Sequence, residues 1–263
     1  MELPSSARRV AFFGGSFDPP HFGHLAIARA ARDLLHLDEV LFVPVGAQPL
    51  KPGGASAGFE DRVAMTRLAV AGNPGFVVSL ADAPKPSGQP NYTIETLHSL
   101  RAQLNPAPLP LKGELFLLMG ADSFRGLRLW HRAAEIPFAA SLIVASRPGQ
   151  DLEDLREALP AGLTMHPVPA SHALGDAKSP DNSRVQSFEV SNAAGKTAPF
   201  YLLPDLHVEI SASAIRDQVA AASAQTSAGP ELLPPPVASY IREHQLYRES
   251  QVQQVPPGPA TRL

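Results

Sequence analysis

The residues with the clearest chemical potential follow a short apolar run near the N-terminus, Arg9–Phe13. Gly14 and Gly15 come first, and because they lack a Cβ they let the backbone approach a ligand closely. His21 and His24 follow three positions apart, so on a helix both lie on one face of the first turn. An imidazole ring can donate its N–H to a phosphate oxygen. The pattern therefore predicts a phosphate-binding turn.

A helix is expected to begin at this turn, because Pro20 suits a first helical turn. Free backbone N–H groups at a helix start, helped by the helix dipole, attract anions. Neither G-x-G-x-x-G nor G-x-x-x-x-G-K-[ST] follows the apolar run, so the histidines replace the usual glycine cradle or lysine. The alternatives are two surface histidines, or a metal site, which lacks a third ligand at suitable spacing nearby. H-x-G-H directly after a strand and Gly-Gly favours phosphate.

A second candidate anion site lies in the segment ISASAIR, residues 210–216. Ser211 is a good N-cap for a following helix. Ser213 and the adjacent N–H groups could bind phosphate, and Arg216 adds a fixed charge with fork geometry. An ordinary capped helix with a solvated arginine explains the segment equally well by itself. Beside the first motif, the phosphate interpretation is favoured.

Strand and helix patterns alternate along the chain. Strands are expected at Arg9–Phe13, Val40–Val45, Phe76–Leu80, Leu115–Met119 and Ser141–Ala145, and helices at Phe22–Leu35, Asp61–Ala71 and Thr93–Leu104. This order predicts an α/β fold: a Rossmann-like, doubly wound parallel sheet with helices on both faces and a small C-terminal helical portion. In such open sheets ligands bind beyond the carboxyl ends of the strands, where both candidate turns lie.

Composition narrows the function further. The chain has 263 residues, 44% of them hydrophobic, a net charge of -3 and no cysteine. Disulfides, zinc-thiolate sites and thiol nucleophiles are therefore excluded. A nucleic-acid-binding surface normally makes the net charge positive, so the negative net charge argues against nucleic-acid binding. The N-terminus lacks a signal-peptide core and no apolar run could span a bilayer, so we expect a soluble cytoplasmic protein with no membrane partner.

The expected domain organisation is simple. Residues 1–248 are expected to form a single domain, with a mobile insertion at 167–199, where Ser, Ala, Asn, Asp and Gly are frequent and no period is sustained. Residues 249–263 have the composition of a disordered tail. The sequence leaves open whether the chain forms a homo-oligomer.

The segment GGSFDPPHFGHL resembles the signature of the H-x-G-H nucleotidyltransferase superfamily, and its F-D-P-P-H form is similar to the nicotinate-mononucleotide adenylyltransferases. The resemblance extends from about Arg9 to Tyr247 and includes Lys51 with Arg62. It also includes NYTIETLHSLR, LMGADSFRGLRLWHR, SRPG, EISASAIR and VASYIREHQLY. In the family pattern I-S-S-T-x-I-R, Ala212 and Ser213 stand for the second serine and the threonine, which weakens one hydroxyl contact.

The resemblance implies a single-domain nucleotidyltransferase of NAD biosynthesis. ATP and nicotinate mononucleotide would be its substrates, Mg²⁺ its cofactor, and nicotinate adenine dinucleotide and pyrophosphate its products. His21, His24, Lys51 and Arg216 would be the catalytic residues, with His24 nearest the transferring group and Lys51 and Arg216 on the β- and γ-phosphates. The remaining ATP-binding residues would be Gly14, Gly15, Ser16, Phe17, Ser211 and Ser213.

The resemblance also implies a pyridine-binding group made of Thr93, Asp122, Trp130 and His131. Trp130 would stack on the nicotinate ring, Thr93 would help to hold its carboxylate, and Asp122 would accept hydrogen bonds from sugar hydroxyls. Each has a plainer alternative. Thr93 and Asp122 could be helix N-caps, and a lone tryptophan is more often part of the core.

Three other functions stay open. The first is a related transferase that prefers nicotinamide mononucleotide. The second is a pantetheine-phosphate or cytidylyl transferase, against which the TIETL, GADS and LWHR segments argue. The third is a nucleotide-sensing module that binds without catalysis, and the presence of both histidines, Lys51 and Arg216 argues against it.

Overall fold

The structure is a computed structural model that describes residues 9–50, 54–105, 113–146, 152–168, 185–203, 210–221 and 232–248. Lys51, residues 169–184 of the expected insertion and the expected tail at 249–263 lie outside the described residues. Among the described residues, no helix has the length and apolar character needed to cross a membrane.

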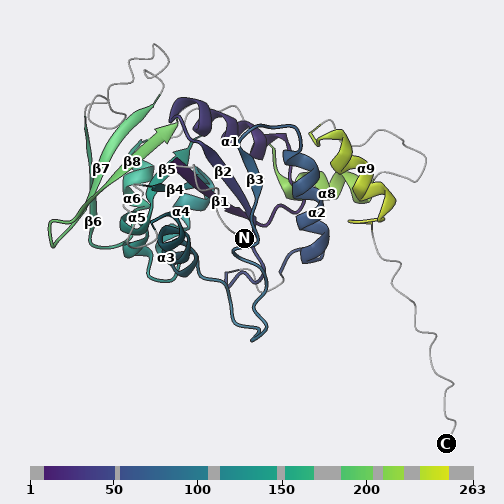
Figure 1. Cartoon of the computed structure of the whole chain (residues 1–263), viewed down its shortest axis with the longest axis horizontal. Coiled ribbons are helices and arrows are strands. Elements are labelled where there is room, and N and C mark those ends of the chain that lie inside the picture. The colour runs from purple at the N-terminus through teal and green to yellow at the C-terminus, as the bar shows by residue number, and fades with distance from the viewer. Residues whose placement is uncertain are drawn as a thin grey trace, which may run out of the picture.

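A single sheet of eight strands, in the described part of the chain, forms the centre of the fold (Figure 1). Its order is β3-β2-β1-β4-β5-β8-β7-β6. The strands are β1 (Arg9–Gly15), β2 (Glu39–Pro44), β3 (Phe76–Val78), β4 (Glu114–Gly120), β5 (Ser141–Ala145), β6 (Leu163–Pro167), β7 (Gln186–Asn192) and β8 (Thr197–Leu203). From β3 to β8 all neighbours are parallel, whereas β7 is antiparallel to both β8 and β6.

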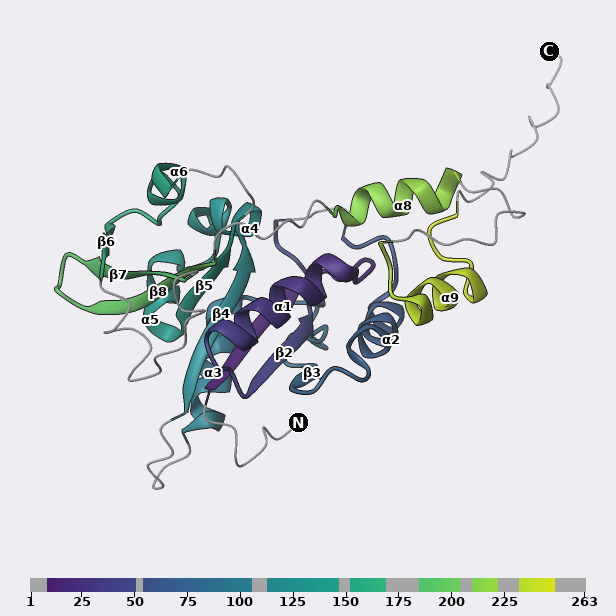
Figure 2. The same ribbon diagram turned by 90° about the horizontal axis from the view of Figure 1, so that it is seen from above.

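Helices cover both faces of the sheet, as a doubly wound fold requires. The helices are α1 (Phe22–Leu34), α2 (Phe59–Val70), α3 (Thr93–Leu104), α4 (Ala121–Arg125), α5 (Ile136–Ala139), α6 (Leu152–Glu157), α8 (Ala212–Ala221) and α9 (Pro235–Glu243). Residues of α1, α2, α8 and α9 join one hydrophobic cluster, and residues of α3 to α6 join the other. Figure 2 shows α8 and α9 beside α2, at the opposite end of the molecule from β6–β8.

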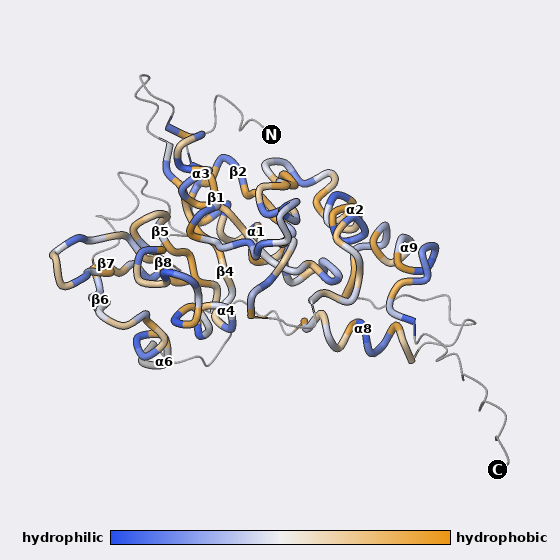
Figure 3. The backbone as a smooth tube through the Cα atoms, turned by 90° about the horizontal axis from the view of Figure 1, so that it is seen from below, coloured by the Kyte–Doolittle hydropathy of each residue, from blue (hydrophilic) through white to orange (hydrophobic). Residues whose placement is uncertain are grey.

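The alternation of side chains along β1 explains why two clusters form. Val10 and Phe12 pack into the cluster on the α3 face, while Ala11 and Phe13 pack into the cluster on the α1 face. Successive strand residues point to opposite faces, so a strand buried on both sides must be apolar throughout. In α8 and α9 the buried residues are apolar, Ile215 in α8 and Val237 and Ile241 in α9, and the tube in Figure 3 alternates between hydrophobic and hydrophilic colours along both helices.

The expected α/β fold is confirmed, and each strand and helix expected from the sequence is present with shifts of a few residues at the ends. The mobile insertion expected at 167–199 is wrong where the structure describes it, because residues 186–192 form β7 and β8 begins at Thr197. Phe188 and Val190 are buried in the α3-face cluster. Glu189, the one residue between them, is exposed, so these three positions alternate as in a strand with one buried face.

Candidate active site

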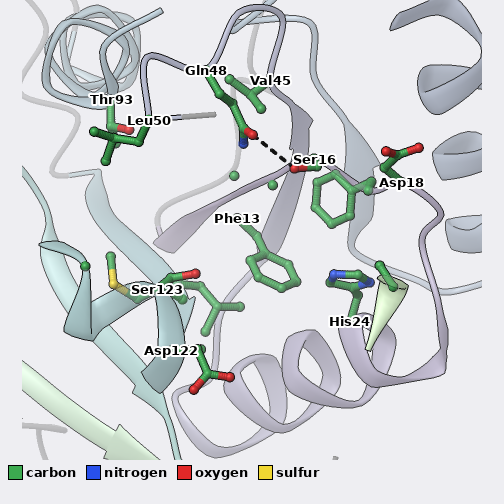
Figure 4. A pocket seen from close by; sticks show the side chains of 18 of the residues that line it. Phe13, Ser16, Asp18, His24, Val45, Gln48, Leu50, Thr93, Asp122 and Ser123 are labelled. Atoms are coloured by element: carbon green, nitrogen blue, oxygen red, sulfur yellow. Dashed lines mark hydrogen bonds between the residues drawn. The ribbon is translucent and has the colours of Figure 1, made fainter. Parts of the chain in front are cut away.

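A cavity of about 1030 Å³ opens beyond the carboxyl ends of β1, β4 and β5 (Figure 4). Its lining contains every sequence-predicted site residue that the structure describes: Gly14, Gly15, Ser16, Phe17, His21, His24, Thr93, Asp122, Trp130, His131, Ser211, Ser213 and Arg216. Lys51 is outside the described residues, although Leu50 and Gly54 on either side line the cavity. Figure 4 shows His24 and Asp18 across the pocket from Thr93 and Asp122.

His21 and His24 form a stacked pair at the start of α1. Their ring centroids are 3.7 Å apart and their planes differ by 28°. His21 is the N-cap of the helix, and its backbone N–H donates to Nδ1 of His24 at 3.2 Å. Because Nδ1 accepts this bond, a neutral His24 carries its proton on Nε2. The local fold thereby fixes the tautomer that can donate a hydrogen bond from Nε2.

Burial keeps both histidines neutral near pH 7. It lowers the pKa of His21 from 6.5 to about 4. Burial, and to a smaller extent the neighbouring His21, lower the pKa of His24 well below its ordinary value. A polyanion bound beside the rings would favour their protonated forms and raise both pKa values. The pair can therefore donate neutral hydrogen bonds and gain positive charge when phosphate arrives.

Gly14 and Gly15 make room for aromatic rings as well as for a ligand. A Cβ on Gly14 would lie 2.6 Å from Cε1 of Phe12, and one on Gly15 would lie 3.2 Å from Cζ of Phe17. Phe17 is 1% exposed, and its ring meets the His24 ring edge-on at 5.0 Å. The buried Phe17 ring packs against the His24 ring, so only the backbone of Phe17 can reach a phosphate.

The start of α1 is less open than the sequence suggests. The helix begins at Phe22, and the Phe22 N–H donates to the carbonyl of Leu232 at 3.0 Å. The N–H of His24 donates to the carbonyl of His21 at 3.0 Å. Two of the first three amides of the helix thus have protein acceptors, so fewer N–H groups are free to bind an anion than the sequence suggests. The histidine side chains are left as the main hydrogen-bond donors that this turn can offer to a ligand.

The second candidate turn brings Arg216 into the same cavity. Ser211 precedes α8, and its hydroxyl accepts a long hydrogen bond of 3.5 Å from the Ala214 N–H, which is a weak N-cap. Nη1 of Arg216 donates to the carbonyl of Asp18 at 2.7 Å, and Nη2 donates to the Ser213 hydroxyl at 3.2 Å. The capped helix of the plainer interpretation is present, but its arginine is held at the cavity wall.

Arg62 ties together the loops that form the floor of the cavity. Its buried guanidinium donates to the carbonyls of Ser16, Val45 and Ala57 at 2.7, 2.9 and 3.3 Å. These carbonyls belong to the loops after β1 and β2 and to the segment before α2. Arg62 therefore positions the backbone of the site and is not available to a ligand.

Asp18 is a site residue that sequence reasoning missed. Its buried carboxylate accepts the backbone N–H groups of Ser56 and Ala57 at 2.6 and 3.0 Å. It also accepts the Tyr247 hydroxyl at 2.8 Å. The signal was present, since an acidic residue inside F-D-P-P-H directly follows a buried strand. Its partners lie too far away in the sequence to be recognised.

The side chains of Asn91 and Gln48 form hydrogen bonds between loops of the cavity wall, and sequence reasoning missed both residues. The Asn91 side chain accepts the Ala47 N–H at 3.2 Å and donates to the Ala83 carbonyl at 3.1 Å. Gln48 accepts the Ser16 hydroxyl at 3.2 Å, as the dashed line in Figure 4 shows. The loop after β2 is thereby connected to the loop after β1 and to the segment before α3.

Thr93 and Asp122 lie on helices but cap neither. Thr93 is the first residue of α3, whose N-cap is Tyr92. Asp122 is the second residue of α4, whose N-cap is Gly120, and it pairs with Arg125 at 3.2 Å. The N-cap interpretations of both residues are therefore wrong. Both line the cavity, with Thr93 half-buried and Asp122 exposed.

Trp130 and His131 complete this wall. Trp130 is half-buried and packs against the α3-face core while it also lines the cavity. The exposed His131 ring lies 4.3 Å from the Tyr92 ring, with an interplanar angle of 34°. An indole with one side on the core and another on the cavity can offer a flat surface to a ring.

Comparison with known proteins identifies the class of this chain. The cytidylyltransferase-like family model matches residues 12–218, which include the histidine turn, the turn from Ser211 to Arg216, and the wall formed by Thr93, Asp122, Trp130 and His131. Over 91% of this chain and 97% of the other, the fold matches the nicotinic acid mononucleotide adenylyltransferase of Plasmodium falciparum, solved complexed with NaAD, with a TM-score of 0.59 and 14% identity. The chain belongs to the cytidylyltransferase-like family and is a nucleotidyltransferase.

Curated relatives define the family more narrowly. The probable nicotinate-nucleotide adenylyltransferase of Pelobacter propionicus is 36% identical over 92% of this chain and 99% of its own length. The protein of the same name from Gloeobacter violaceus is 39% identical over 91% of this chain and 96% of its own length. The chain therefore belongs to the nicotinate-nucleotide adenylyltransferase family, and the resemblance found in the sequence is confirmed.

Proposed function

We propose that this chain transfers the adenylyl group of ATP to nicotinate mononucleotide, which gives nicotinate adenine dinucleotide and pyrophosphate for NAD biosynthesis. One observation carries the proposal. One cavity beyond the sheet brings together His21, His24 and Arg216, which would form a phosphate end, and a second group, which would form a pyridine end: Thr93, Asp122, Trp130 and His131. A cavity of about 1030 Å³ has room for two small ligands side by side.

The reaction needs positioning more than acid–base chemistry. The nucleophile is a 5′-phosphate oxygen of the mononucleotide, already largely dianionic near neutrality, so no general base is required. This oxygen attacks the α-phosphorus of ATP, a new P–O bond forms, and the bond to the bridging oxygen of pyrophosphate breaks. Catalysis then rests on in-line placement and on stabilisation of the charge that develops on the transferring group.

The phosphate end supplies that stabilisation. His24 would donate from Nε2 to the α-phosphate, and His21, stacked on it, would grip the neighbouring phosphates. Both rings gain protons more readily as negative charge accumulates beside them. Arg216, together with Lys51, would bind the β- and γ-phosphates and then the leaving pyrophosphate. The backbone of Gly14 to Phe17 and the hydroxyls of Ser211 and Ser213 would complete the ATP contacts.

Mg²⁺ is proposed as the accompanying ion. Among the described residues, no group of three His, Asp or Glu side chains could hold a metal, and the Asp18 carboxylate is already occupied by protein donors. The donor set thus provides no dedicated metal cage. The ion would come with the triphosphate, held mostly by phosphate oxygens and water, and no step above is routed through it.

The pyridine end suits an acid more than an amide. In the described lining of the cavity, Arg216 is the sole lysine or arginine, and it lies at the phosphate end. Thr93 and backbone N–H groups would bind the nicotinate carboxylate, and hydrogen bonds to a charged acceptor are the stronger kind. Trp130 would stack on the ring, with His131 beside it, and Asp122 would accept bonds from the sugar hydroxyls.

Pyrophosphate release tests the proposal. The purified chain would be incubated with ATP and Mg²⁺, and with nicotinate mononucleotide, nicotinamide mononucleotide or phosphopantetheine in turn. We expect rapid release with the first, slow release with the second and none with the third. Release only with phosphopantetheine would overturn the substrate assignment. Tight ATP binding without release under any condition would favour the nucleotide-sensing module.

A further inference from the structure

Two tyrosines of the C-terminal helical portion reach carboxylates of the main body in the same way. The Tyr240 hydroxyl donates to Oδ1 of Asp61 at 2.9 Å, and the Tyr247 hydroxyl donates to Oδ1 of Asp18 at 2.8 Å. Asp61 is in the first turn of α2 and, like Tyr240, is not part of the described cavity lining. Asp18 lines the cavity, whereas Tyr247 does not. The two hydrogen bonds are chemically alike, but only the Tyr247 bond ends on a carboxylate that lines the cavity.

The hydrogen bonds of Asp18 determine how closely it can pair with Arg216. Its Oδ1 accepts the Ala57 N–H and the Tyr247 hydroxyl, and its Oδ2 accepts the Ser56 N–H. Nη1 of Arg216 is 3.9 Å from Oδ2, beyond hydrogen-bond length, and donates instead to the Asp18 carbonyl at 2.7 Å. These three donors hold the carboxylate in place, and the guanidinium is close to it without a bidentate pair.

We infer that Tyr247 is a positioning residue for Arg216. By occupying Oδ1 of Asp18, its hydroxyl keeps the carboxylate from turning toward the guanidinium and forming a close ion pair. Arg216 then remains aimed at the cavity, with its charge available to the phosphates of ATP. This inference rests on the proposed role of Arg216 in triphosphate binding.

The backbone around Tyr247 supports a specific placement. Tyr247 has φ 62 and Gln245 has φ 53, both in the left-handed region that side chains other than glycine rarely adopt. The turn that contains them is fastened by the Leu246 N–H, which donates to the Ile241 carbonyl at 3.0 Å. Burial, followed by the Asp18 carboxylate, raises the pKa of Tyr247, so the hydroxyl remains a proton donor at all ordinary pH values. Tyr247 thus adopts a disfavoured backbone conformation at the position where its hydroxyl meets the Asp18 carboxylate.

The test compares Tyr247→Phe with Tyr240→Phe in the full chain. Each variant loses one hydroxyl from a tyrosine–aspartate bond between the C-terminal portion and the body, so Tyr240→Phe controls for the loss of such a bond. Because Asp18 is buried and Asp61 is half-buried, Tyr247→Phe should lose the more stability. Only Tyr247→Phe should weaken triphosphate binding. We expect the KM for ATP and the Kd for inorganic tripolyphosphate to rise about five- to tenfold, as when a bond to a charged group is lost. The KM for the mononucleotide should change less than twofold in both variants.

A second comparison shows whether the effect passes through Arg216. In an Arg216→Ala background, Tyr247→Phe should weaken tripolyphosphate binding by less than twofold, since the residue that it positions is gone. An unchanged five- to tenfold effect in that background would overturn the inference. So would equal tripolyphosphate binding by Tyr247→Phe and Tyr240→Phe, or failure of Tyr247→Phe to fold where Tyr240→Phe folds. Tripolyphosphate binding needs no turnover, so this result is separate from any failure of the wild type to release pyrophosphate.

Discussion

The two ends of the cavity are built differently. At the phosphate end, His21 is 5% exposed, Asp18 4% and the supporting Arg62 3%. The side chains of Asp18 and Arg62 are bonded to several loops, and the backbone of His21 is bonded to His24. At the pyridine end, Asp122 and His131 are exposed, and the neighbouring Leu129 is 66% exposed. One end is locked by buried polar bonds, and the other presents side chains on the surface of a wall.

This difference follows from what each end must recognise. Charge that develops during phosphoryl transfer is best met by groups already in place, because reorganisation at that moment slows the reaction. A flat ring and its substituent can be bound by surfaces that adjust on contact. We therefore expect substitutions at the phosphate end to reduce turnover, and substitutions at the pyridine end to reduce affinity or selectivity.

The largest effect is expected for His24→Ala. Loss of a donor that stabilises the transferring phosphate should lower kcat about a hundredfold or more, with a smaller change in KM. Steady-state pyrophosphate release measures it, with His166→Ala, an exposed histidine on β6, as the control. A His24→Ala protein with nearly normal kcat would remove the distinction between the two ends.

The choice between acid and amide is the second test. An amide in the pyridine pocket would point its NH₂ group at N–H and hydroxyl donors, and each buried donor left unpaired costs about 1–3 kcal/mol. With two such contacts disturbed, kcat/KM should favour nicotinate over nicotinamide mononucleotide by roughly a hundredfold. The measurement uses both mononucleotides side by side at saturating ATP and Mg²⁺. Equal values would leave adenylyl transfer in place and contradict the nicotinate assignment.

Trp130→Ala should have a moderate effect confined to one substrate. Loss of stacking should raise the KM for either mononucleotide roughly three- to tenfold, with the KM for ATP unchanged, while the acid preference partly survives. Trp130→Phe keeps an aromatic surface and should recover most of the affinity. A large fall in kcat with unchanged KM would show that Trp130 belongs functionally to the phosphate end.

The last test concerns stability in acid rather than activity. In the folded protein the pKa of His21 is lowered to about 4 and that of His24 also lies well below 6.5, so below pH 6.5 the unfolded chain binds more protons. The free energy of unfolding should therefore fall as pH drops from 6.5 toward 4, by at most about 1.4 kcal/mol per pH unit for each histidine. Urea titrations at several pH values test this.

His21→Gln should lose the share of this acid sensitivity that belongs to His21, while His166→Gln, at an exposed position, should keep all of it. Identical pH profiles for the wild type and His21→Gln would show that the buried histidine is not neutral in the folded state. The burial of a neutral histidine could then not be part of the explanation for the rigidity of the phosphate end.

The sequence predicts the first half of the fold well because its strands are continuous apolar runs and α1 and α3 have clear helical periods. The region of β6–β8 escaped prediction for two reasons. β7 is mostly polar, with Phe188 and Val190 as its signs of a buried strand, and the apolar end of β8, Phe200 to Leu203, directly follows the segment 167–199 that was expected to be mobile. The composition of residues 186–192 suggested a mobile segment, whereas in the structure these residues pair with β8 and form the strand β7. Local composition cannot reveal a partner that comes later in the chain.

The site shows the same limit. The motifs contain the residue types that line the cavity, and their roles stay predictions. The network beneath them was not visible, since Arg62 bonds to Ser16 across 46 positions and Tyr247 to Asp18 across 229. No sequence period connects such pairs. Only a folded backbone brings a buried guanidinium to three separate loops.

The bond between the Phe22 N–H and the Leu232 carbonyl has a consequence for biosynthesis of the protein. The ribosome makes the histidine turn well before it makes Leu232 and Tyr247. Domains tend to fold as units during synthesis, and contacts between distant segments form late. A nascent chain can therefore carry both histidines and still lack Leu232, which binds the start of α1, and Tyr247, which binds Asp18. We expect nucleotide binding to reach full strength only after the C-terminal portion has left the ribosome and docked.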